Sequence, residues 1–198
     1  MKICVIVEGA YPYVMGGVAS WLQDNICHFS EDEFIIQTIT VNRQEKKKFA
    51  YELPNNVIEV REAYIQDEDY EMKGSKLKFT KKEKESFESL FYGENVEWEV
   101  IFRYFEKNRV SLNQFLASEE FLEMSRRYYE KHYSEEVFSD FLWTMRSMFL
   151  PLFSILNTPV PEADIYHTLS TGYAGILGSM AKVLYGKPLL LSEHGIYT

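Results

Sequence analysis

Apolar runs without alternation lie near both ends of the chain. Residues 3–7 (ICVIV) and 189–191 (LLL) contain no polar residue, as in strands that are buried on both faces of a parallel sheet. A loop rich in glycine, proline and tyrosine follows the first run and ends at Gly17. Apolar residues then recur at helical spacing, at Val18, Leu22, Ile26 and Phe29. A strand, a glycine-containing loop and a helix in this order predict the opening of a Rossmann-like unit.

Three further segments have the composition of strands. Residues 34–41 (FIIQTITV) follow the first helix, and residues 56–60 come after a Leu-Pro-Asn turn. Residues 163–167 (ADIYH) precede a helix expected over residues 171–184, whose small residues permit close packing on a sheet. The pattern therefore predicts an α/β fold with a mostly parallel sheet and flanking helices.

Between these segments the pattern becomes helical, over about residues 62–157. Apolar and aromatic residues there share helix faces, and residues 80–83 (TKKE) fit a capping box. Ser118 and Ser134 each precede two glutamates, as at helix N-termini, and Pro151 is expected to end the last helix. We predict a helical insertion of about four helices, whose aromatic residues form a core or a subdomain interface rather than a ligand site.

Charge and cysteine content narrow the classes of function. The net charge is −9, and the basic clusters are short and interleaved with glutamates. Both features argue against nucleic acid as a binding partner. Cys4 and Cys27 lack the spacing of a metal site, so we expect two buried free thiols and no metal. The first apolar run is too short for a signal peptide, and no stretch reaches the roughly 20 residues of a membrane span. We expect a cytoplasmic protein, with docking at the inner face of the cell membrane left open.

Gly16 and Gly17 directly precede the first helix. Glycines there let the backbone approach a ligand, and the helix N-terminus attracts a phosphate through free N–H groups and its dipole. Many such loops contain glycine for turning alone, and we weigh the two explanations equally. The spacing is neither G-x-G-x-x-G nor a P-loop, which argues against a nicotinamide-dependent dehydrogenase.

Other polar residues follow the predicted parallel strands, at the edge where ligands gather in open α/β sheets. For His194 we favour a role in a site over a structural one, because it lies between Glu193 and Gly195 where a core strand would be apolar. His167 is either structural or lines the cleft, and Ser170 or Thr171 is first of all a helix N-cap. Glu8 and Glu193 form a conceivable carboxylate pair at this edge, although we favour a structural role for each.

Four segments resemble the PelF-type glycosyltransferases of Pel exopolysaccharide synthesis, which belong to the family 4 retaining GT-B enzymes. They span nearly the whole chain, in the order expected for that family: residues 8–21 (EGAYPYVMGGVASW), 53–62 (LPNNVIEVRE), 167–175 (HTLSTGYAG) and 188–198 (PLLLSEHGIYT). One departure is Met15, which stands where the family commonly has an arginine and so removes one phosphate contact.

The resemblance implies two Rossmann-like domains that face a cleft. The N-terminal domain receives a glycan acceptor, while the C-terminal domain holds most of a UDP-sugar, by family assignment UDP-glucose, and carries the E-x7-E motif. It further implies that Gly16 and Gly17 contact the donor diphosphate, that His194 contacts the donor sugar near the reacting centre, and that no metal is required.

The sequence stops directly after its last predicted strand, so we expect the second domain to be missing and the fragment to be inactive by itself. The alternative is a non-catalytic interaction module that docks a membrane polysaccharide synthase complex through its aromatic helical insertion. An exposed apolar patch on that insertion would favour docking.

Overall fold

The computed structural model describes residues 1–9, 11–41, 48–66 and 77–194. The chain divides into two compact units, one made of residues 1–67 and 158–198 and the other of residues 68–157. The first contains the sheet, and the described part of the second is helical. The helical unit was expected from about residue 62, but the strand that precedes it continues to Tyr64.

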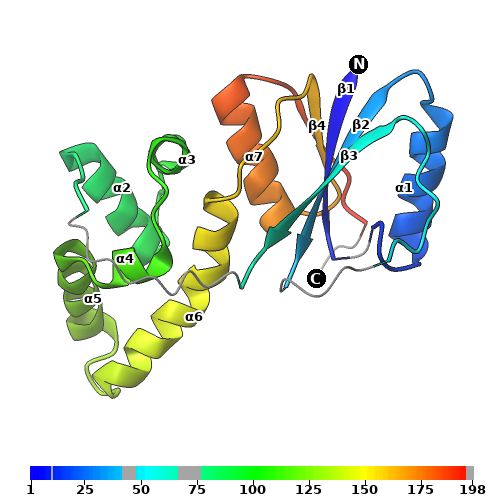
Figure 1. Ribbon diagram of the computed structural model, residues 1–198. Helices are drawn as coiled ribbons and strands as arrows, with labels where there is room; N and C mark the ends of the chain where they lie inside the picture. The colour runs from blue at the N-terminus through cyan, green and yellow to red at the C-terminus, as the bar shows by residue number, and fades with distance from the viewer. Residues whose placement is uncertain (10, 42–47, 67–76, 195–198) are drawn as a thin grey trace. The chain divides into compact units, whose positions relative to one another are not determined.

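The α/β unit is built on a five-stranded parallel sheet with the strand order β3-β2-β1-β4-β5 (Figure 1). This is the order of a doubly wound sheet, and its direction reverses between β1 and β4. The predicted α/β, Rossmann-like fold is therefore confirmed. The strands are β1 (Lys2–Glu8), β2 (Glu33–Thr40), β3 (Val57–Tyr64), β4 (Ile165–Thr168) and β5 (Leu189–Leu191).

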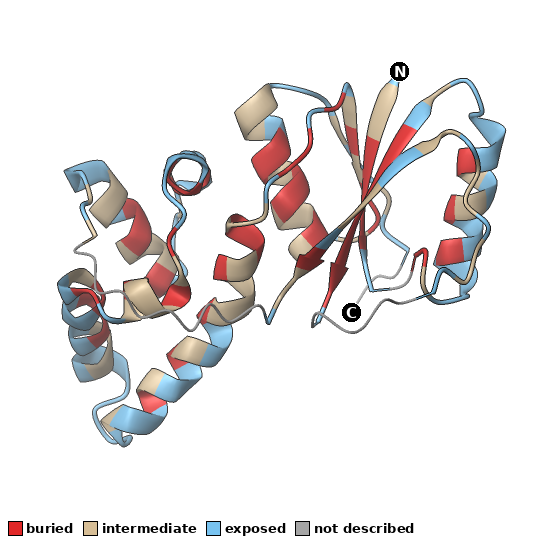
Figure 2. Cartoon of the chain, viewed as in Figure 1, coloured by how far each residue is buried: buried red, intermediate tan, exposed pale blue. Residues whose placement is uncertain are grey.

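Two helices cover opposite faces of this sheet (Figure 1), and the central strands β1 and β2 are mostly buried (Figure 2). Val5 and Val7 belong to a core cluster with Leu22 of the first helix. On the other face, Ile6 lies close to Gly178 of the second helix, where an added Cβ would be 3.7 Å from Ile6 Cδ1. Successive residues of β1 thus pack against different helices, which explains its uninterrupted apolar run. The two helices are α1 (Gly17–His28) and α7 (Tyr173–Tyr185).

The edge strand β5 differs from the expectation of a buried strand. Leu190 and Leu191 are 54% and 48% exposed, although both are apolar. β5 pairs with β4 on one side and is the last strand of the described sheet, so it lacks the cover that a central strand receives. An apolar run indicates a strand but does not distinguish a central strand from an edge strand.

The helical unit has an aromatic core. The ring centroid of Phe115 lies 5.4 Å from that of Phe87, 5.3 Å from that of Phe121 and 5.0 Å from that of Phe153. All four rings are buried, so this part of the aromatic content forms a core, as predicted. The helices are α2 (Lys81–Tyr92), α3 (Trp98–Lys107), α4 (Leu112–Leu116), α5 (Glu119–His132) and α6 (Phe138–Leu156).

The ends of these helices partly follow the sequence signals. The capping box at the start of α2 is present, and Ser118 caps α5 by accepting a hydrogen bond from the Phe121 N–H. The N-cap predicted at Ser134 is wrong, because α6 begins only after Val137 and has no side-chain cap. Pro151 does not end α6, which continues to Leu156. Buried aromatic side chains on both sides of this proline keep the helix packed in the core, and this packing outweighs the lost backbone hydrogen bond.

The two cysteines lie in different environments. Cys4 is buried in β1, and this burial raises the pKa of its thiol to about 12. Cys27 is exposed, so the expectation of two buried thiols is wrong for this residue. It follows Ile26, which faces the core, and therefore lies on the solvent side of α1. Over the described part of the chain, no helix is long and apolar enough to cross a bilayer.

Candidate functional site

The carboxyl ends of β1 and β4 meet beside the start of α1. A pocket of about 210 Å³ opens there, and its lining includes Glu8, Tyr11, Val18, Leu22 and Ser170. It lies where the strand order of the sheet reverses, which is the usual ligand position in doubly wound folds. The structure thus brings Glu8 and Ser170, two residues singled out in the sequence, to a pocket beside the glycine loop.

Glu8 holds the N-terminus of α7. Its Oε1 accepts hydrogen bonds from Ser170 Oγ and from the Ala174 N–H, both at 2.8 Å. A Cβ on Gly172 would lie 2.8 Å from the same oxygen, so a larger residue there would displace the Glu8 carboxylate from this position. The N-cap expected at Ser170 or Thr171 is wrong: Gly172 is the N-cap and has no side-chain bond, because a carboxylate from the neighbouring strand bonds the helix instead.

The N-terminus of α1 is open by contrast. Its N-cap residue is Gly16, which has no side chain that could cap the helix, and the first turn contains no acidic residue. The N–H of Gly16 itself donates a hydrogen bond of 3.3 Å to the hydroxyl of Tyr51. A Cβ on Gly16 or Gly17 would meet no atom of a described residue within 4 Å, and neither glycine has a positive φ. The sharp turn after β1 instead uses Gly9, which has a φ of 76°. Backbone strain therefore does not explain the glycine pair, whereas access for a ligand would.

Two histidines and a tryptophan lie together at the ends of β4 and β5. The ring centroid of Trp21 on α1 is 4.8 Å from that of His194 and 6.3 Å from that of His167. His167 Nε2 is 2.9 Å from Ser192 Oγ. Burial lowers the pKa of His167, and the nearby His194 lowers it further because two positive charges repel. His167 is thus held neutral in a half-buried position, while His194 is exposed at the edge.

Trp21 and Ser192 were not chosen as site residues from the sequence. Trp21 follows Gly17 by one helical turn, so it lies on the same side of α1 as the glycine pair. That spacing is a usable signal. The contact between His167 and Ser192 depends on the pairing of β4 with β5, in which His167 lies opposite Leu190.

The other candidates lie at the surface of the α/β unit. Thr171 and Glu193 are exposed at the carboxyl edge of the sheet. Met15 is 72% exposed in the glycine loop, so its side chain projects into solvent. Among the described residues, no three or more His, Cys, Asp or Glu side chains are grouped as a metal site.

Comparisons with known proteins show the family to which the chain belongs. No curated protein and no solved structure matches the chain. One family model matches residues 1–198, and its description is a domain of unknown function, DUF3492. The chain therefore belongs to the DUF3492 family.

Proposed function

We propose that this chain is the acceptor-side domain of a retaining GT-B glycosyltransferase that uses a UDP-sugar, by resemblance UDP-glucose, in exopolysaccharide synthesis. The open N-terminus of α1 is the observation that supports this proposal best. It combines a glycine N-cap, a first turn without acidic residues and two glycines at which an added Cβ would meet no described atom within 4 Å. A diphosphate fits such a place because backbone N–H groups and the helix dipole favour an anion.

The contrast with α7 limits where the diphosphate binds. Both helix N-termini follow strands of the same parallel sheet, so both lie near its carboxyl edge. The one on α7 is already bonded by the carboxylate of Glu8, which would repel a second anion. Of these two helices, α1 is therefore the one that offers its backbone to a phosphate.

In this proposal the backbone amides at Gly16 and Gly17 stabilise the charge of the leaving UDP, and the Gly16 N–H exchanges its hydrogen bond to Tyr51 for one to the phosphate. The bond between the anomeric carbon and the phosphate oxygen breaks while the acceptor hydroxyl attacks the same face of the sugar. The acceptor proton passes to the leaving phosphate oxygen. His194, supported by the ring of Trp21, bonds the donor sugar. The resemblance assigns the uridine pocket and the E-x7-E glutamates to a C-terminal domain, which is also the proposed partner of this surface.

The test measures UDP release from UDP-glucose by the longest reading frame that contains this chain. It compares two variants of the proposed site with one control variant. Gly17→Trp fills the space before α1 and is expected to abolish release, and His194→Ala is expected to reduce it strongly. Asp24→Trp places the same side chain on an exposed position of α1 away from its N-terminus, and should retain activity. The proposal is wrong if Gly17→Trp releases UDP as fast as the Asp24→Trp control.

A non-catalytic docking role for the helical unit is the second candidate. Val137, Trp143 and Met148, which lie on and just before α6, are large apolar side chains that are 62%, 66% and 62% exposed. A membrane polysaccharide synthase complex is the partner we propose for these side chains. Retention of polymer synthesis in Gly17→Trp and His194→Ala, with its loss in Trp143→Ser, would favour docking over catalysis.

A further inference from the structure

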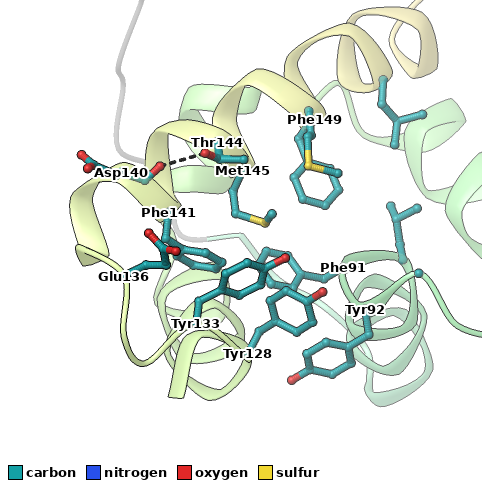
Figure 3. Close-up of a pocket in the computed structure, with 14 residues that line it drawn as sticks. Phe91, Tyr92, Tyr128, Tyr133, Glu136, Asp140, Phe141, Thr144, Met145 and Phe149 are labelled. Carbon is teal, nitrogen blue, oxygen red and sulfur yellow. Dashed lines mark hydrogen bonds between the residues drawn. The ribbon is translucent and has the colours of Figure 1, made fainter. Parts of the chain in front are cut away.

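The helical unit contains a second, larger pocket. Its volume is about 440 Å³, within the range of small-molecule sites, and it lies among the end of α2, the end of α5 and one side of α6 (Figure 3). Tyr92, Tyr128 and Tyr133 form a row along one side, and Met145 and Phe149 of α6 lie opposite this row (Figure 3). From the sequence, these aromatic residues were expected to form a core or a subdomain interface rather than a ligand site.

The aromatic side of the pocket is held in place by its own packing. The ring centroid of Tyr128 lies 5.4 Å from that of Phe91, 5.3 Å from that of Tyr92 and 5.7 Å from that of Tyr133. Tyr133 in turn lies 5.4 Å from Phe141. These contacts fix the rings before any ligand arrives, which reduces the entropy that binding would cost.

The charged side chains that line this pocket are all negative. The lining includes the carboxylates of Glu136 and Asp140 but no lysine, arginine or histidine. Glu136 lies beside Phe141 and Tyr133, whereas the carboxylate of Asp140 points away from the tyrosines (Figure 3). Burial raises the pKa of Tyr128, the neighbouring Tyr133 adds to this shift through its charge and a side-chain hydrogen bond, and Glu94 contributes less. The pocket is therefore unfavourable for phosphates and other anions and favourable for a cation.

We propose that this pocket binds a small organic cation, an ammonium group carried on a compact apolar body. The electron-rich faces of aromatic rings attract such a cation, and the Glu136 carboxylate supplies the opposite charge. The methionine and phenylalanine side chains of α6 contact the apolar body. This site lies in the helical unit and does not depend on the proposed transferase activity.

Choline and its uncharged isostere 3,3-dimethylbutan-1-ol test the proposal on the whole chain. They have the same shape, and only choline has a charge. Binding is followed by NMR of labelled methionine methyl groups, because Met145 and Met148 line the pocket. Both signals are expected to shift with choline, which should bind about tenfold more tightly than the alcohol, a difference of about 1.4 kcal/mol.

Two variants separate the charge of the pocket from its shape. Glu136→Gln should weaken choline binding several-fold and leave alcohol binding unchanged. Glu135→Gln should change neither, because Glu135 is exposed like Glu136 but does not line the pocket. The proposal is overturned if the alcohol binds as tightly as choline, if Glu136→Gln weakens both ligands equally, or if choline shifts neither methyl signal.

Discussion

Replacing Glu8 tests how the end of β1 is coupled to α7. Glu8→Ala removes the acceptor of two 2.8 Å hydrogen bonds, from Ser170 Oγ and the Ala174 N–H. A hydrogen bond to a charged group contributes about 1.5–3 kcal/mol, and loss of a helix cap costs about 1 kcal/mol. Because the Glu8 side chain is exposed, solvent weakens both contributions, and we expect a total loss of about 2 kcal/mol. Glu8→Gln keeps an acceptor oxygen and loses the charge, so about 1 kcal/mol is expected.

Urea unfolding and hydrogen exchange measure this effect together. Two units are present, so unfolding of the whole chain is complemented by the exchange rate of the Ala174 amide, which reports α7 directly. In a thermal scan, 2 kcal/mol corresponds to about 4–8 °C for a chain of this size. Glu193→Ala is the matched control, because this carboxylate is exposed at the same edge of the sheet.

The coupling is refuted by either of two results. One is a Glu8→Ala protein whose free energy of unfolding stays within about 0.5 kcal/mol of the unaltered chain. The other is an Ala174 amide that exchanges at the same rate with and without the carboxylate.

Three further predictions concern the same unit and use urea unfolding. Gly178→Ala should lower the free energy of unfolding by about 1–3 kcal/mol, because the new Cβ collides with Thr168, whereas Gly17→Ala meets open space and should leave it unchanged or raise it by about 0.4–1 kcal/mol. Thr168→Val should raise it by about 1 kcal/mol, because the buried Thr168 hydroxyl has no hydrogen-bond partner among the described residues. His167 has a lowered pKa, so stability should fall as the pH drops below about 6.5 towards that pKa, where the unfolded chain binds more protons; His167→Gln should remove this slope.

The sequence predicts the sheet well because its strands have distinctive compositions. β1 and the core of β2 read as buried strands, and they are buried. The far half of β3 was missed because it contains charged residues such as Glu62, which an edge strand tolerates. The five-residue helix Leu112–Leu116 was also missed, since it is too short to show a helical period, although Ser111 and Gln114 form a capping box at its start.

The sequence predicted where in the fold the candidate site lies, but it did not predict which of its residues contact one another. Residues that follow parallel strands meet at one edge, so Glu8, His167 and Ser170 could be placed together. The bond between Glu8 and Ser170 joins residues 162 positions apart, and it depends on the exact register of β1 against β4. No local pattern encodes such a bond. The pocket of the helical unit was missed for the same reason, since it arises from how three helices pack.

The most direct test of the transferase proposal is UDP release from a panel of UDP-sugars. The longest reading frame that contains this chain is assayed beside residues 1–198 alone. The account predicts turnover of one UDP-sugar, by resemblance UDP-glucose, with the longer protein only. Absence of turnover with every UDP-sugar, or equal turnover by residues 1–198 alone, would contradict it.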